Sequence, residues 1–193
     1  MMQNQLYPIF LKVTELNTLI VGGGNVALEK LTFLLKSSPE AKVIMVSPVF
    51  KDETVVLAKK HEVQLFEQNY DDSFLENKQI VIVTTNLVEV NKQVYADCKE
   101  RNILVNLADN PPYCDFYMGG IVTKGNVKIA ISTNGKSPTL AKRLRQFFED
   151  VLPTEIDELT ENLNEYRKSI KGNLEQKVVA LNEFTKGLVS KNK

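Results

Sequence analysis

A glycine-rich stretch is the part of this sequence whose residue types and spacing point most directly to chemistry. A short apolar run, residues 18–21, leads into Gly22-Gly23-Gly24-Asn25-Val26-Ala27, which reads G-x-G-x-x-A and opens a helical pattern. In dinucleotide-binding folds the first glycine permits a tight turn, and the second lets the backbone approach a pyrophosphate. Exposed N–H groups at the start of the helix then favour the anion. The segment predicts dinucleotide binding through Gly22, Gly24, Asn25 and Val26; the alternative is an ordinary strand-to-helix turn.

The second expected strand lacks the acidic residue that often accompanies this motif. An Asp or Glu about 20 residues further on usually binds the adenosine ribose 2′-OH. Here the strand ends in Val46-Ser47-Pro48-Val49-Phe50. Ser47 can exchange a hydrogen bond, but it neither repels a 2′-phosphate nor pairs with one, so the spacing leaves NAD and NADP open. The fourth expected strand ends in Thr84-Thr85-Asn86. This segment is either a second cofactor contact, through Thr85, or simply a turn.

Asp109 is the candidate for proton transfer. It ends the fifth expected strand, in Val105-Asn106-Leu107-Ala108-Asp109-Asn110-Pro111. A carboxylate at this edge of a parallel sheet would face the place where a ligand and a nicotinamide meet. It could accept a proton or orient a substrate there. The alternative role is an aspartate that caps the following turn.

Residues 115–145 carry an excess of positive charge, with Asp115 as the single acid. The basic residues are Lys124, Lys128, Lys136, Lys142, Arg143 and Arg145. Such a segment suits a ligand with several carboxylates or phosphates, although the last three also fit a solvated helix face. Lys136 is the better binding candidate, because it lies in a polar loop just before Ser137-Pro138, a favourable helix start.

The elements that would position these residues alternate between strands and helices. Strands are expected at 18–21, 42–46, 63–66, 80–84 and 103–107, and helices at 25–36 and 88–101. This alternation predicts an α/β fold with a Rossmann-like parallel sheet, ending near Asn110-Pro111-Pro112. A β-hairpin (117–123 and 127–132) and a helix (139–151) are expected next, followed by two amphipathic helices parted at Gly172.

Composition excludes several classes of protein. The 193 residues contain 24 basic and 24 acidic side chains, which argues against a polybasic nucleic-acid-binding protein. Two cysteines without a CxxC spacing favour a reducing cytoplasm over a disulfide scaffold. No apolar run approaches the roughly 20 residues that span a bilayer, so no membrane partner is expected. A single histidine, His61, makes a His-rich metal site or catalytic triad improbable, and no metal is predicted.

The order of four motifs resembles the precorrin-2 dehydrogenase / sirohydrochlorin ferrochelatase family of sirohaem synthesis. The motifs are Tyr7-Pro8-Ile9-Phe10-Leu11, the glycine segment with Lys30, the segment 106–111, and Ser132-Thr133-Asn134-Gly135-Lys136-Ser137-Pro138. They recur in this order at matching distances. The resemblance covers roughly residues 6–150, whereas the C-terminal helices match only in general character.

The resemblance implies a homodimer that uses NAD to oxidise precorrin-2, a tetrapyrrole, to sirohydrochlorin. It implies an NAD-binding Rossmann domain (1–112), a dimerisation and substrate region (113–150) and a small helical C-terminal domain (151–193). It also implies that Asp109 is catalytic. Asn25-Val26 and Val49-Phe50 match segments that contact the cofactor, largely through backbone groups. Thr133 falls where some relatives carry a serine near the substrate. The implied substrate contacts are therefore Thr133, Lys136 and Ser137.

Two other functions stay open at this point. Some members of this family also insert Fe²⁺ into sirohydrochlorin, and a carboxylate proton acceptor would suffice for that step. The other possibility is a non-catalytic, dimeric NAD-sensing module, which would need neither Asp109 nor a site for an anionic macrocycle. A dehydrogenase for a small hydroxy acid fits less well, because the chain has no histidine near these motifs and no substrate domain of adequate size.

Overall fold

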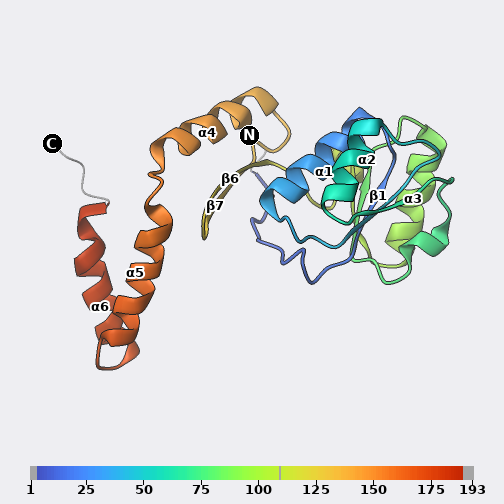
Figure 1. Ribbon diagram of the computed structural model, residues 1–193. Helices are drawn as coiled ribbons and strands as arrows, with labels where there is room; N and C mark the ends of the chain where they lie inside the picture. The colour runs from blue at the N-terminus through green and yellow to red at the C-terminus, as the bar shows by residue number, and fades with distance from the viewer. Residues whose placement is uncertain (1–3, 109, 189–193) are drawn as a thin grey trace. The chain divides into compact units, whose positions relative to one another are not determined.

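The computed structural model describes residues 4–108 and 110–188. They form two compact units (Figure 1). The first unit extends to Gly119 and includes residues 134–136, and the second contains residues 120–133 and those from Ser137 onward. No described helix is long and apolar enough to cross a membrane.

The first unit is built on a five-stranded parallel sheet with the strand order β3-β2-β1-β4-β5. The strands are β1 (Thr18–Val21), β2 (Val43–Val46), β3 (Gln64–Phe66), β4 (Ile80–Val83) and β5 (Leu104–Leu107). Val21 is in register with Val46 on one side and with Val83 on the other. The carboxyl ends of β1, β2 and β4 therefore meet at one edge of the sheet.

Helices cover both faces of this sheet, as the continuous apolar strands require. The helices of the first unit are α1 (Asn25–Ser37), α2 (Asp52–Lys60), α3 (Val88–Glu100) and the short 3-10 helices η1 (Asp72–Leu75) and η2 (Pro111–Tyr113). One core cluster joins α1 and α2 to strand residues such as Ile20. A second cluster joins α3 to the opposite face, for example to Leu19. Figure 1 shows α1 and α2 together and α3 across β1 from them.

The second unit, as far as residue 188, contains a β-hairpin and three α-helices. Its elements are β6 (Gly120–Lys124), β7 (Val127–Ile131), α4 (Pro138–Val151), α5 (Ile156–Ser169), α6 (Leu174–Thr185) and the 3-10 helix η3 (Lys186–Leu188). Asp157 of α5 fixes the hairpin turn, because its Oδ1 accepts hydrogen bonds from the backbone N–H of Asn126 at 2.6 Å and from its side-chain amide at 2.9 Å. Gly125, with φ of +51°, provides the turn.

The predicted fold class is confirmed: a parallel sheet is followed by a hairpin and helices. The predicted strands and helices are present, with ends that coincide or differ by up to three residues. Helix α2, between β2 and β3, was not expected from the sequence.

Candidate functional site

The predicted cofactor segment lies where the strand order of the sheet reverses. The chain leaves β1 into α1 on one face of the sheet and leaves β4 into α3 on the other face. In open parallel sheets, ligands bind outside the carboxyl ends of the strands at such a switch point. The residues between β1 and α1 therefore stand at the position that this fold uses for a nucleotide.

Gly22 makes the tight turn that the motif predicts. Its φ is +122°, a conformation that side chains other than glycine rarely adopt. A Cβ at this position would overlap Oγ1 of Thr84 and lie 3.2 Å from its carbonyl carbon. The N–H of Gly22 donates to the carbonyl oxygen of Val46 at 2.9 Å. The turn is thus closed between the ends of β2 and β4.

Gly23 and Gly24 have opposite surroundings. A Cβ on Gly23 would overlap the carbonyl oxygen of Val49 and lie 2.8 Å from Oγ of Ser47 and 3.0 Å from a ring carbon of Phe50. A Cβ on Gly24 would have nothing within 4 Å. Packing within the unit therefore requires glycine at Gly23 but not at Gly24, whose open side suits a ligand that must approach the backbone.

The start of α1 is suited to an anion. Gly24 is the N-cap residue and supplies no side-chain hydrogen bond, and no acidic residue lies in the first turn. The first N–H groups of a helix lack intrahelical partners, and the helix dipole places partial positive charge there. Asn25 begins the helix exposed to solvent, and Val26 is half-buried. A diphosphate would therefore meet backbone donors at this end.

The loop after β2 is folded back on itself. Ser47 is 8% exposed, and its hydroxyl donates to the carbonyl oxygen of Val49 at 2.8 Å. Phe50 is buried in the core beside α1 and α2, whereas Val49 is 74% exposed. Of these three predicted cofactor residues, Val49 alone presents its side chain to solvent.

Lys51, which sequence reasoning did not select, connects this loop to the glycine turn. Its N–H donates to the carbonyl oxygen of Gly23 at 3.1 Å, and its Nζ donates to Oδ1 of Asn25 at 2.7 Å. Nζ also lies 3.6 Å from a carboxylate oxygen of Glu53. The pKa of Glu53 is lowered, first by a hydrogen bond from its own backbone and then by the charge of Lys51. The spacing from the glycine motif gave no signal for this contact.

The two threonines after β4 are used inside the fold. Oγ1 of Thr84 donates to the carbonyl oxygen of Val21 at 2.8 Å. Oγ1 of Thr85 donates to Oδ1 of Asn91 at 2.6 Å and accepts the N–H of Leu87 at 3.1 Å. Thr85 thereby orders the beginning of α3, at the same edge as the glycine turn.

Asp109 lies outside the described residues, but the chain on both sides of it is well defined by contacts. The N–H of Ala108 donates to the carbonyl oxygen of Val83 at 2.9 Å, and that of Asn110 donates to Leu107 at 3.1 Å. The segment after β5 is therefore bound to the ends of β4 and β5. This is the edge of the sheet on which the glycine turn also lies.

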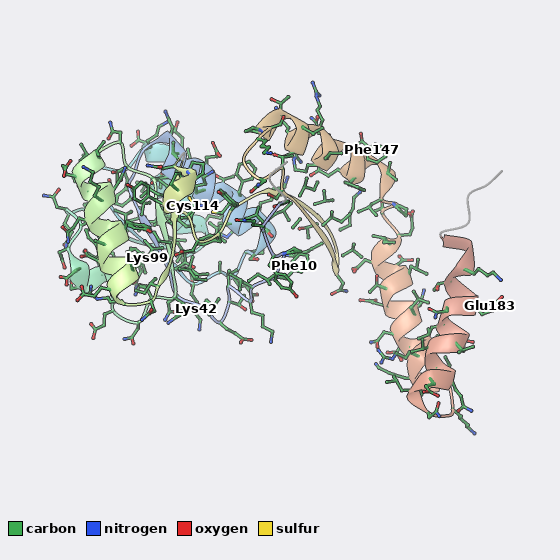
Figure 2. The ribbon with its side chains drawn as sticks, turned by 180° about the vertical axis from the view of Figure 1, so that it is seen from behind. Phe10, Lys42, Lys99, Cys114, Phe147 and Glu183 are labelled. Carbon is green, nitrogen blue, oxygen red and sulfur yellow. The ribbon has the colours of Figure 1, made fainter. Side chains whose placement is uncertain are left out.

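Cys114 reinforces this segment. Its Sγ lies 3.1 Å from the carbonyl oxygen of Leu107 and 3.4 Å from that of Asn110, as a donor to each. Burial raises the pKa of the Cys114 thiol, which keeps the donating proton in place. Asp115, the next residue, accepts from Nζ of Lys99 on α3 at 2.7 Å; Figure 2 labels Lys99 and Cys114.

The predicted substrate residues in the loop between β7 and α4 mostly bond within that loop. Oγ1 of Thr133 lies 3.1 Å from the carbonyl oxygen of Ser137, as a donor, and 3.2 Å from its N–H, as an acceptor. Oγ of Ser137 accepts the N–H of Leu140 at 3.2 Å and so caps α4, as the sequence predicted. Lys136 is exposed. Among the described residues, no group of three or more His, Cys, Asp or Glu side chains could hold a metal ion.

Comparison with known proteins supplies the family. Residues 9–120 match the family NAD_binding_7, whose description is NAD(P)-binding. The chain belongs to this NAD(P)-binding family. Residues 124–150, from the end of β6 to the end of α4, match a second family, described as sirohaem biosynthesis protein central.

Relatives of the chain are longer proteins. It is 37% identical over 167 residues to the siroheme synthase of Pseudoalteromonas translucida, covering 86% of this chain and 35% of that protein. The siroheme synthase of Pseudoalteromonas atlantica is 38% identical, covering 86% and 36%. The chain thus spans about a third of the length of these relatives.

A solved structure has the same fold. The protein described as SirC, precorrin-2 dehydrogenase, superposes with a TM-score of 0.77 over 92% of this chain and 88% of its own, at 24% sequence identity. At this coverage the match includes residues of both units.

Proposed function

We propose that the chain is an NAD-dependent dehydrogenase that oxidises precorrin-2 to sirohydrochlorin in sirohaem biosynthesis. The observation that carries this proposal is the anion-accepting start of α1 at the switch point. This helix has no side-chain cap and no acid in its first turn, and a Cβ on Gly24 would meet no atom within 4 Å. The two family matches, one NAD(P)-binding and one from sirohaem biosynthesis, support it.

The residues at the sheet edge fit a dinucleotide. Backbone N–H groups from Gly24 to Val26 would hold the diphosphate, and the Gly22 turn would let it approach. The exposed side chain of Val49 would supply an apolar contact for the adenosine half. Ser47, Phe50 and Thr85 would act by shaping the two neighbouring loops. When bound, the nicotinamide provides the hydride acceptor.

The oxidation removes a hydride and a proton from the substrate. We assign the proton to the Asp109 carboxylate, which would accept or relay it from the tetrapyrrole carbon or nitrogen that loses it. The substrate carries several carboxylates, so Lys136 would contribute charge, and the loop closed by Thr133 and Ser137 would position it. Holding the two reactants in a productive geometry would supply most of the rate.

The organisation of this chain forms part of the same proposal. It comprises a cofactor domain (1–112), a dimerisation and substrate region (113–150) and a helical C-terminal domain (151–193), assembled as a cytoplasmic homodimer. The arrangement of the exposed apolar side chains on α4, among them Leu140, Phe147 and Val151, is compatible with burial against a second copy.

Anaerobic incubation with precorrin-2 and NAD tests the activity. NADH and sirohydrochlorin should appear together in the absorbance spectrum. Asp109→Asn should lower the turnover number by at least about a hundredfold while leaving NADH binding unchanged. Glu175→Gln, at an exposed position of α6, is the matched control.

The outcomes separate the candidate functions. Unchanged turnover in Asp109→Asn would remove that residue from the mechanism. Cofactor binding without any turnover of precorrin-2 by the wild type would leave the sensing module as the function. Adding Fe²⁺ after the first reaction shows whether the chain also inserts the metal.

A further inference from the structure

Lys51 is placed where the adenosine half of a dinucleotide would lie. Its side-chain nitrogen is 2.7 Å from Oδ1 of Asn25, the first residue of α1, and its backbone is bonded to Gly23. Lys51 also ends the loop that follows β2. The ammonium group is thus held between the diphosphate end of the predicted site and the strand end at which the adenosine ribose binds in this fold.

The loop between β2 and Lys51 admits a phosphate as well as a bare hydroxyl, although Asp52 and Glu53 follow Lys51 in the first turn of α2. The residues from the end of β2 to Lys51 are Val46, Ser47, Pro48, Val49 and Phe50, so none of them is an acid that would bond a 2′-OH and repel a 2′-phosphate. Ser47 directs its hydroxyl to the carbonyl oxygen of Val49. Lys51 is therefore the charged group of this loop that can reach a ligand.

The competing partner of Lys51 is weakly bound. Glu53 lies 3.6 Å from Nζ, and the two side chains are 38% and 64% exposed for Lys51 and Glu53, respectively. Exposed ion pairs of this kind contribute little to stability. The bond to Asn25 is a hydrogen bond to a neutral amide. A dianionic phosphate offers the ammonium a partner of higher negative charge than either.

We propose that Lys51 is a specificity-determining residue that binds the 2′-phosphate of NADP, so that the site accepts NADP(H) as well as NAD(H). This inference rests on the dinucleotide site of the proposed function, and it is independent of the identity of the substrate. In the bound state Nζ leaves Glu53 and bonds phosphate oxygens beside the start of α1.

Binding titrations of the full chain with NADPH and with NADH, followed by nucleotide fluorescence, test the assignment. The wild type should bind both. Lys51→Gln should weaken NADPH binding by about tenfold or more and change NADH binding by less than about twofold, as expected for loss of one charge-assisted bond. Lys51→Arg should retain NADPH, and Glu53→Gln should bind it more tightly. Lys59→Gln, exposed in the last turn of α2, is the control.

Several results would overturn the proposal. A wild type that binds NADH but not NADPH would do so directly. If Lys51→Gln weakened the binding of NADPH and NADH equally, Lys51 would contact the diphosphate or only hold the turn. Unchanged NADPH binding in this variant would show that Lys51 does not contact the 2′-phosphate. A wild type that binds neither nucleotide would contradict the proposed function itself, which distinguishes that failure from a failure of the Lys51 assignment.

Discussion

Substituting the neighbouring residues Gly23 and Gly24 should separate packing from ligand binding. A methyl group on Gly23 would enter the space of the Val49 carbonyl oxygen, with Ser47 Oγ and Phe50 only 2.8 and 3.0 Å away. Two of these three contacts are polar or backbone atoms that cannot move without disturbing the loop after β2. Overpacking of this kind costs about 1–3 kcal/mol. We therefore expect Gly23→Ala to lower the free energy of unfolding by that amount.

Gly24→Ser should leave stability intact and weaken dinucleotide binding. Gly24 has φ of −84° and ψ of −162°, which any residue can adopt, and its Cβ would meet no atom within 4 Å. Serine is also a better N-cap residue than glycine, by about 0.3 kcal/mol. The free energy of unfolding should thus stay equal or rise slightly. The new side chain, however, would bond the N–H groups and fill the space that a diphosphate needs.

The loss of affinity follows from the hydrogen bonds at stake. A hydrogen bond to a charged group contributes about 1.5–3 kcal/mol, which corresponds to roughly tenfold to hundredfold weaker binding of NADH by Gly24→Ser. Urea unfolding and fluorescence titration of the two variants beside the wild type measure both quantities. Wild-type affinity in Gly24→Ser, or wild-type stability in Gly23→Ala, would refute this account of the turn.

Three further variants test groups elsewhere in the first unit. Cys114→Ala removes the thiol that bonds the carbonyl oxygens of Leu107 and Asn110. Turnover of precorrin-2 should therefore fall by about tenfold to hundredfold, with NADH affinity retained. Unchanged steady-state kinetics would show that Cys114 does not position the segment after β5. Burial raises the pKa of the Cys98 thiol from 9.0 to about 12. Above pH 9 the unfolded chain releases a thiol proton that the folded chain keeps, so the free energy of unfolding should fall by up to about 1.4 kcal/mol per pH unit until pH 12. The fall should be less steep in Cys98→Val. Equal pH slopes of the unfolding free energy in the two proteins would contradict this. Tyr70→Phe removes the hydroxyl that donates to Asp97 at 2.9 Å and should cost about 1 kcal/mol in urea unfolding, with no loss expected if the bond is not formed in solution.

The sheet and its first helix could be predicted because their signals are local. β1 and β4 are short runs of apolar and β-branched residues, and α1 has apolar residues at helical spacing. Helix α2 escaped prediction for a physical reason. Its fully buried residues are Thr54 and Ala58, one polar and one small. Its large apolar residues, 55–57, are consecutive, and only Leu57 packs against the core, so they do not show the spacing that reveals a helical period.

The middle glycine of the motif shows what spacing alone leaves out. In G-x-G-x-x-A, Gly23 occupies a variable position, and the sequence assigned it no role. Its need for glycine arises from the loop around Val49, which is distant along the chain and reaches the turn only once β1 and β2 are paired. The same pairing brings Lys51 to Asn25. Both features depend on register between strands, which a linear motif does not contain.

A common pattern links the polar residues that the sequence selected. The hydroxyls of Ser47, Thr85 and Ser137 each bond backbone or side-chain groups of their own loop or of the helix that follows it. Hydroxyls used in this way fix the positions of loops and leave little bonding capacity for a ligand. The groups then left to hold a dinucleotide are backbone N–H groups at the start of α1 and the ammonium of Lys51. Such a site would bind the diphosphate through the shape of the chain and the 2′-phosphate through one side chain, which would account for a β2 end without an acid.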